Sequence, residues 1–201
     1  MLEILKNWVT NNYIELFGTI TGLIYVVLSI KQVIWLWPVG FISSTVYIVV
    51  FFQSTLYADM GLQVYYLAVS AYGWIHWKNN KKQTSKTDSL KILTINLKQW
   101  IIIISSIGIL GISLYYPLLK YTNATNPLFD GFVTSGSIIA TWMLARKILE
   151  QWLIWIVVDG VSILLFIIKH LYPTAILFGV YTILAIIGYF NWKKEWIAQK
   201  Y

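Results

Sequence analysis

The chain has 201 residues, of which 58% are hydrophobic and only 11% are charged. A soluble globular domain carries roughly 25% charged residues and about 45–50% apolar ones. Fifteen basic and eight acidic residues cannot cover so much apolar surface, so the composition excludes a disordered chain, a fibrous repeat, a nucleic-acid-binding module and an ordinary cytosolic enzyme. The predicted class is an all-α polytopic membrane protein with a single domain over residues 1–201.

Several kinds of chemistry are excluded by residues and motifs that the sequence lacks. The chain has no cysteine, which excludes disulfides, thiolate metal sites and cysteine nucleophiles. It also lacks the HExxH, GxSxG and Walker motifs of common enzyme classes. We therefore expect a protein that is not an enzyme and that uses no cofactor and no metal.

Runs of mostly apolar residues organise the whole chain. A helix that crosses the hydrocarbon core of a bilayer needs about 20 such residues. The first 13 residues show no cleavable signal peptide, so the first run is expected to stay as a membrane helix. We predict seven spans, at residues 14–30, 33–52, 57–77, 100–119, 128–145, 150–168 and 172–192.

Basic residues predict the orientation of these spans. Residues 78–99 carry six lysines and one acid, and we interpret this segment as a solvated cytoplasmic loop. Seven crossings then place the N-terminus outside and the C-terminus in the cytoplasm. With that orientation twelve basic residues lie inside and three, Lys6, Lys120 and Lys169, lie outside, which agrees with the positive-inside rule.

The chain also repeats with an offset of 115 residues and no gap. Rare residue types recur at this offset, as in the pairs Trp37 and Trp152, Tyr66 and Tyr181, and Gly73 and Gly188. We predict two three-helix repeats over residues 14–77 and 128–192, joined by the basic loop 78–99 and a linker helix over 100–119. The odd number of crossings makes the repeats parallel, a 3+1+3 arrangement known from SWEET transporters.

The strongest candidate site is the segment QWLIWIVVDG in the sixth span. Trp152, Trp155 and Asp159 lie three and four residues apart, so they share one helix face. An acid deep in a membrane helix is costly and usually faces a cavity or a partner. Tryptophan faces attract cations and flat rings, which predicts a small, flat, cationic or amide-bearing ligand. Two alternatives for Asp159 remain: a structural hydrogen bond to Ser43 or Ser44 in the second span, and a buried, protonated acid that binds no ligand.

A second polar face runs along the third span. Asp59, Gln63, Tyr66 and Ser70 are spaced by four and three residues and continue to Gly73 and Trp77. Lipid does not tolerate such a face, so we expect it to line a cavity or a helix interface. The matching face of the seventh span contains Tyr181 and is less polar. Gly73 and Gly188 are expected to serve close helix packing, whereas Trp35, Trp77, Trp100 and Trp192 fit an interfacial aromatic belt.

The stretches LYADMGLQVYYLAVSAYGWIHW (56–77), ARKILEQWLIWIVVDGVSI (145–163) and GYFNW (188–192) resemble the PnuC family of bacterial vitamin transporters. The resemblance covers nearly the whole chain. It implies a SWEET-like fold in the bacterial inner membrane and uptake of nicotinamide riboside by facilitated diffusion. A cytosolic vitamin kinase would trap the substrate by phosphorylation without having to contact the transporter. The chain could also form a homo-oligomer.

The family's binding motif is WxxWxxxN, and one position departs from it here. Trp152 and Trp155 match the tryptophans, and Asp159 takes the place of the asparagine. An amide both donates and accepts hydrogen bonds, whereas a carboxylate only accepts. Asp159 could face the carboxamide and pyridinium of nicotinamide riboside. It would equally suit thiamine, with its donating aminopyrimidine and cationic thiazolium, and would suit neutral riboflavin less.

The sequence therefore predicts substrate binding by Trp152, Trp155, Asp159, Gln63, Tyr66, Asp59, Tyr181 and Ser44, in a site formed by the second, third, sixth and seventh spans. The predicted partners are a small vitamin and the lipid bilayer, with no nucleic acid. An alternative from another class is a seven-helix sensor that binds a ligand without transporting it. Such a sensor would have to signal through a second protein, because the chain offers only short segments outside the spans.

Overall fold

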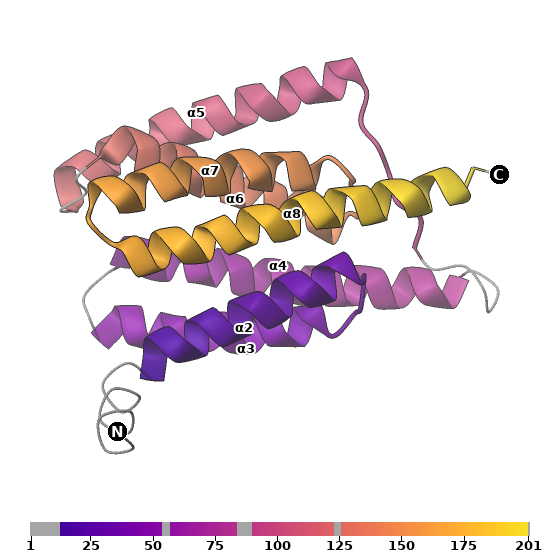
Figure 1. Cartoon of the computed structure of the whole chain (residues 1–201), viewed down its shortest axis with the longest axis horizontal. Helices are drawn as coiled ribbons and strands as arrows, with labels where there is room; N and C mark the ends of the chain where they lie inside the picture. Colours follow the sequence, from indigo (N-terminus) through magenta and orange to yellow (C-terminus); the bar gives the residue numbers. More distant parts are fainter. Residues whose placement is uncertain (1–12, 54–56, 84–89, 123–125, 201) are drawn as a thin grey trace.

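A computed structural model describes residues 13–53, 57–83, 90–122 and 126–200. In these residues the chain forms seven α-helices that lie side by side along a common direction (Figure 1). Their bounds are α2 Tyr13–Ile30, α3 Leu36–Gln53, α4 Tyr57–Gln83, α5 Leu97–Tyr121, α6 Pro127–Ala145, α7 Gln151–Ile168 and α8 Tyr172–Ala198.

Each predicted span corresponds to one of these helices. The main differences are at helix ends: α4 and α8 both continue six residues beyond the predicted spans, and α5 starts three residues earlier. The start of α5 is fixed by a capping box, in which Asn96 and Gln99 each accept a hydrogen bond from the other's backbone N–H. Apolar periodicity detects the buried or lipid-facing part of a helix, so it misses polar turns that extend beyond it.

Five of the described helices, α3, α5, α6, α7 and α8, are long and apolar enough to cross a membrane. The helix α2 provides a shorter apolar stretch, Leu16–Ile30, and α4 does not reach this hydropathy. The reason in α4 is its polar side chains, Gln63 and Ser70 among them, which face the interior of the bundle rather than lipid. The predicted all-α architecture is confirmed, and five of the seven predicted spans are identified as possible membrane crossings by length and composition alone.

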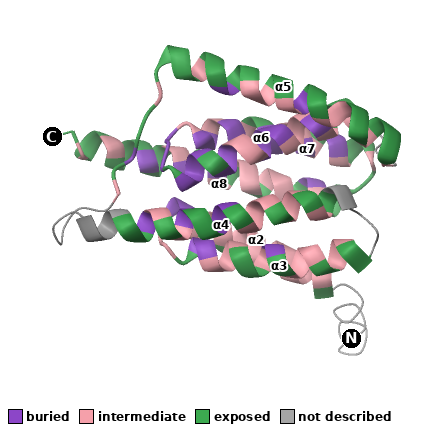
Figure 2. Cartoon of the chain, turned by 180° about the vertical axis from the view of Figure 1, so that it is seen from behind, coloured by how far each residue is buried: buried purple, intermediate pink, exposed green. Residues whose placement is uncertain are grey.

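Six of the helices form a closed ring. Contacts run from α2 to α3, α3 to α4, α4 to α6, α6 to α7, α7 to α8 and from α8 back to α2. The helix α5 lies outside this ring and packs on α6, and Figure 2 shows that most of its residues are exposed. The first helix of each triple, α2 or α6, therefore contacts the third helix of the other triple.

The turns that precede α3 and α7 have the same geometry, 115 residues apart. Gln32 and Lys147 both adopt left-handed backbone angles, with φ of 54° and 53°. The backbone N–H of Val33 donates to Leu28 O at 2.9 Å, and that of Ile148 donates to Met143 O at 3.0 Å. A left-handed conformation is costly for residues other than glycine, so its recurrence at corresponding positions marks a shared local fold.

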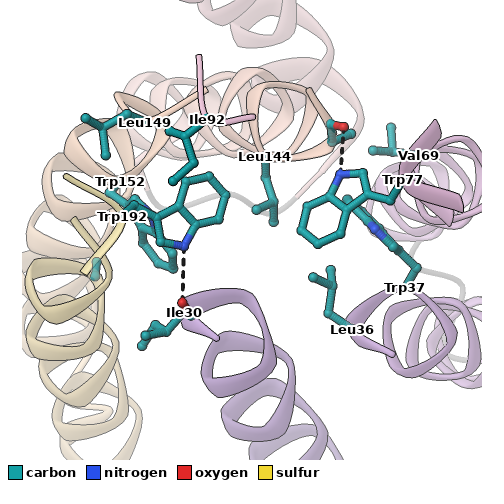
Figure 3. Packing of buried hydrophobic residues seen from close by; sticks show 12 residues of the cluster. Ile30, Leu36, Trp37, Val69, Trp77, Ile92, Leu144, Leu149, Trp152 and Trp192 are labelled. Carbon is teal, nitrogen blue, oxygen red and sulfur yellow. Dashed lines mark hydrogen bonds between the residues drawn. The ribbon is translucent and has the colours of Figure 1, made fainter. Parts of the chain in front are cut away.

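The end of the bundle at which α2 and α6 finish and α3 and α7 begin is called the floor end, and the opposite end the mouth end. Buried residues fill the floor end and form the floor cluster (Figure 3). Its members are Ile30, Leu36, Trp37, Val69, Trp77, Ile92, Leu144, Ala145, Leu149, Trp152, Ala185 and Trp192. Trp77 and Trp192 are 4% and 0% exposed, so the prediction that they belong to an interfacial belt is wrong.

Polar contacts tie several segments together around the floor cluster. Lys147 Nζ donates to Gln32 Oε1 at 2.8 Å and to the Leu90 carbonyl at 3.1 Å, and Gln32 Nε2 donates to Glu195. Leu93 exchanges backbone hydrogen bonds with the turn before α7, donating to Lys147 O and accepting from the N–H of Leu149. The floor end is thereby closed by contacts between both triples and the segment that leads into α5.

Candidate functional site

A cavity of about 780 Å³ lies inside the ring of six helices. Its walls come from α2, α3, α4, α6, α7 and α8, and it reaches the mouth end beside Leu16, Tyr47 and Pro173. Toward the floor end it is bounded by Ser29, Leu144 and Trp152, of which Leu144 and Trp152 belong to the floor cluster. A cavity of this size falls within the range of about 300–1,000 Å³ that is typical of small-molecule sites.

The two triples contribute corresponding residues to the walls. Ten pairs of lining residues are separated by 115 positions, including Gly40 and Trp155, Ser44 and Asp159, and Tyr66 and Tyr181. The members of a pair often differ in size and polarity, as glycine and tryptophan do at the first of these positions. The cavity therefore lies between two similar halves but has chemically different sides.

Seven of the eight predicted site residues line this cavity: Ser44, Gln63, Tyr66, Trp152, Trp155, Asp159 and Tyr181. The structure thus brings together residues from four helices that the sequence analysis selected on separate grounds. Asp59 does not line the cavity. Its side chain is exposed in the first turn of α4, where the charges of Asp130 and Lys169 act on it. The polar face of α4 extends to the mouth end, beyond the part of the helix that lines the cavity.

Asp159 is 4% exposed and lies in the cavity wall near the middle of α7. No hydrogen bond joins its carboxylate to Ser43 or Ser44 in the described residues; Ser43 Oγ instead lies 3.3 Å from Thr21 Oγ1. The Tyr181 hydroxyl is close enough to interact with Asp159 electrostatically, and the described part of the chain provides no ion-pair partner for the carboxylate. The carboxylate is therefore available to a ligand.

The indole of Trp152 is held in place from two sides. A methyl group added at Gly188 would lie 2.7 Å from the ring, so only glycine allows this approach. On the other side, Trp192 makes an edge-to-face contact with a centroid distance of 5.7 Å and an angle of 87°. Trp37 has the same arrangement in the other half, with Gly73 and with Trp77 at 5.4 Å and 90°. The close-packing role predicted for Gly73 and Gly188 is confirmed.

The helices α2 and α6 also contribute to the cavity wall, which was not predicted from the sequence. Tyr25, Ser137 and Thr141 line the cavity, as do Gly18 and Gly22. These two glycines make room for tyrosines from other helices: an added Cβ would lie 1.6 Å from the Tyr47 hydroxyl and 2.2 Å from that of Tyr181, respectively. The signal was present as two glycines four residues apart in an apolar span, a spacing typical of close helix contacts.

Gln151 was also missed as a lining residue. It is fully buried at the start of α7, directly before Trp152, and its side chain borders the cavity. In the described residues no group of three or more His, Cys, Asp or Glu side chains is placed to hold a metal ion. The arrangement suits recognition of a flat organic molecule by aromatic faces, hydroxyls, amides and one carboxylate.

Comparison with known proteins gives the family. A sequence model described as nicotinamide mononucleotide transporter matches residues 12–194. The chain belongs to this transporter family. It is therefore a multi-pass membrane protein of a transporter family, and its relatives are named as transporters rather than enzymes.

Individual relatives in this family are distant but cover most of the chain. The nicotinamide riboside transporter PnuC of Escherichia coli (strain K12) is 28% identical over 213 residues, covering 92% of this chain and 85% of the relative. PnuC of Neisseria mucosa is 26% identical and covers 92% and 73%. The riboflavin/roseoflavin transporter RibM of Streptomyces davaonensis is 27% identical and covers 92% and 85%.

One solved structure has the same fold. A crystal structure of the vitamin B3 transporter PnuC superposes with a TM-score of 0.76 at 23% sequence identity, covering 98% of this chain and 87% of that one. The similarity extends over the whole helical ring and α5, because so little of the chain is left unmatched.

Proposed function

We propose that this protein takes up a small heteroaromatic vitamin, nicotinamide riboside in the first instance, across the bacterial inner membrane by facilitated diffusion. The observation that carries the proposal is the cavity between the two triples, with Trp152, Trp155 and Asp159 in one wall. Membership in the transporter family and the names of the PnuC relatives support it.

The lining residues match the chemistry of such a substrate. The indoles of Trp152 and Trp155 would stack on a flat cationic ring, an interaction worth about 0.5–2 kcal/mol per ring. The carboxylate of Asp159 would offset the positive charge of a pyridinium. Gln63 and Tyr66, from α4, would meet the hydroxylated remainder of the molecule.

The membrane arrangement that we propose is a 3+1+3 fold with parallel repeats over residues 14–77 and 128–192. The paired lining residues, the equal turns at Gln32 and Lys147 and the ring of contacts support this arrangement. All seven helices would cross the bilayer, with the N-terminus outside and the C-terminus in the cytoplasm, as the distribution of basic residues indicates. The mouth end would then face outward and the floor end inward.

Transport would proceed by alternating access, with the two triples moving relative to each other around the bound substrate. The cavity extends to the mouth end, and the floor cluster fills the floor end, which suits the outward-facing half of such a cycle. Phosphorylation of the substrate by a cytosolic kinase would keep the net flux inward. The kinase would not need to contact the transporter.

Thiamine is the second candidate substrate, and Asp159 is the observation that favours it. The aminopyrimidine of thiamine donates hydrogen bonds, its thiazolium is cationic, and a carboxylate can serve both. Riboflavin is a third candidate because RibM, a relative of similar identity, is named as a riboflavin transporter. Riboflavin is neutral, however, and gives the carboxylate less to bind.

The decisive experiment is a parallel titration of the purified protein with nicotinamide riboside, thiamine and riboflavin, followed by tryptophan fluorescence or calorimetry. We expect one of them to bind, and Asp159→Ala to weaken its binding at least tenfold, which equals about 1.4 kcal/mol. Asp59→Ala, which removes an exposed carboxylate outside the cavity, serves as the matched control. Unchanged affinity after replacing Asp159 by Ala or Asn would show that the carboxylate does not bind the substrate.

A flux measurement separates transport from ligand sensing. Liposomes that contain the purified protein should accumulate the radiolabelled vitamin only to equilibrium, without ATP, and should exchange it in both directions. A sensor would bind the vitamin in the titration but give no flux above that of empty liposomes.

A further inference from the structure

Gln151 is a fully buried amide that the described residues leave without hydrogen bonds. Its exposure is 0%, and its side chain lines the cavity at the floor end. Neither Oε1 nor Nε2 has a hydrogen-bond partner in the part of the chain that the structure describes. Buried side-chain amides in folded proteins are almost always paired, so an unpaired one beside a cavity calls for an explanation.

The corresponding position in the other half shows that the fold does not require an amide here. Leu36 lies 115 residues before Gln151, begins α3 as Gln151 begins α7, and is also 0% exposed. It packs in the floor cluster next to Trp37, just as Gln151 precedes Trp152. A leucine would therefore satisfy this position at lower cost, because burying an unpaired amide is unfavourable.

Ser29 adds a second unpaired polar group at the same depth. Its side chain is 2% exposed and lines the cavity, and its Oγ has no hydrogen-bond partner in the described residues. The position 115 residues later is Leu144, which is again apolar. The Trp152 indole N–H is unpaired as well, but so is that of Trp37, which does not line the cavity. An unpaired indole N–H is therefore common to both halves and does not depend on the cavity.

We propose that Gln151, together with Ser29, recognises an amide-type edge of the substrate ring, meaning a hydrogen-bond donor next to an acceptor. A glutamine side chain is uncharged and offers both functions side by side, so it pairs with a carboxamide, an aminopyrimidine or an imide. A carboxylate, which only accepts, leaves the glutamine acceptor unpaired. This inference rests on the proposed function and adds a specificity-determining residue to its site.

The spacing along α7 fixes how a substrate would lie. Gln151, Trp155 and Asp159 follow one another at steps of four residues, so they share one face, and the first and last are separated by about 12 Å along the axis. A ring stacked on Trp155 would turn its amide-type edge toward Gln151 at the floor. Its positive charge would then lie on the side of Asp159, and its hydroxylated remainder would point to Gln63, Tyr66 and the mouth end.

The test is Gln151→Leu, which installs the residue that the other half carries at this position. We expect the ligand-free variant to unfold at the same temperature as the wild type or higher, because an unpaired buried amide has been removed. We expect its affinity for the bound vitamin to fall about 10- to 100-fold. A purely structural glutamine would give the opposite pattern: lower thermal stability and an affinity that is unchanged once the protein is folded.

A pair of ligands makes the test independent of stability. The wild type should prefer nicotinamide riboside over nicotinate riboside, and thiamine over an analogue in which hydrogen replaces the amino group of the pyrimidine, so that the donor of the edge is lost. Gln151→Leu should reduce whichever preference the wild type shows, while Leu36→Gln, the exchange in the other half, should lower stability and leave that preference intact. Equal preference in the wild type and Gln151→Leu would overturn the inference. A wild type that binds none of the vitamins would instead overturn the proposed function.

Discussion

Trp77 and Trp192, 115 residues apart, each donate an indole hydrogen bond to the opposite half of the molecule. Trp77 Nε1 donates to Ala145 O at 3.0 Å, and Trp192 Nε1 donates to Ile30 O at 3.2 Å. Ile30 and Ala145 are the last residues of α2 and α6 and are themselves 115 positions apart. The third helix of each half is thus bonded to the end of the first helix of the other half, and both bonds lie at the floor end (Figure 3).

These reciprocal bonds predict the effect of removing either indole N–H. Trp77→Phe and Trp192→Phe should each lower the free energy of unfolding by about 1–3 kcal/mol, because each loses a buried hydrogen bond and part of a buried ring. Thermal unfolding in detergent measures the loss. Trp35→Phe is the control, since Trp35 is 62% exposed, and should change stability by less than about 0.5 kcal/mol. Equal effects at all three positions would contradict the role of the bonds.

The glycines that contact tryptophan rings predict a difference between the two halves. The added Cβ would lie 2.5 Å from the Trp37 ring in Gly73→Ala and 2.7 Å from the Trp152 ring in Gly188→Ala. Both should destabilise the fold by about 1–3 kcal/mol through overpacking. Only Gly188→Ala should also weaken substrate binding several-fold, because Trp152 lines the cavity and Trp37 does not. Titration of the two variants side by side checks this, and equal affinities would place the Trp152 ring outside the binding site.

Lys147 predicts a pH dependence of stability. Lys147 is 2% exposed, and its Nζ lies 4.7 Å from the centre of the Trp77 ring. Burial lowers the pKa of Lys147 to about 8, although the negative charge of Glu195 acts in the opposite direction. An unfolded lysine has a pKa of about 10.4. Between pH 8 and about 10.4 Lys147 holds a proton in the unfolded state that it has lost in the folded state. The free energy of unfolding therefore rises with pH through this window, and below pH 8 Lys147 causes no pH dependence.

The measurement compares the wild type with Lys147→Gln, which carries the residue found at the corresponding position 32. The stability difference, wild type minus variant, should increase between pH 7.5 and pH 10 by on the order of 1–3 kcal/mol. Using the difference cancels the titration of other lysines and tyrosines. A difference that stays constant or decreases over this range would show that burial does not lower the pKa of Lys147.

Asp59 and Gln63 lie one turn apart on α4 and predict opposite outcomes. Asp59 is exposed and outside the cavity, whereas Gln63 lines it. Asp59→Asn should therefore change the affinity for the bound vitamin less than about twofold, and Gln63→Ala should weaken it by about three- to tenfold through the loss of one hydrogen bond. Calorimetric titration of both variants decides the point. A strong loss of affinity in Asp59→Asn alone would show that Asp59 contacts the substrate.

Much of the fold could be predicted from the sequence because membrane helices depend on local properties. Apolar length sets each span, and the offset of 115 residues predicted that Trp37 and Trp152 would occupy similar surroundings. Seven of the eight predicted site residues line one cavity, since polar groups on a membrane helix usually face the interior of the bundle or a cavity. Asp59 shares the polar face of α4 without lining the cavity, because periodicity gives the face of a helix but not the depth at which a cavity ends.

Only the tertiary structure decided which helices surround the cavity and which polar groups remain unpaired there. In the sequence Gln151 is one more polar residue at a span boundary, and Trp77 and Trp192 fit an aromatic belt. The structure buries all three, because the ring closes through contacts between each first helix and the third helix of the other half. Those contacts join residues more than 65 positions apart, as from Trp77 to Ala145, and no local pattern encodes such a distance.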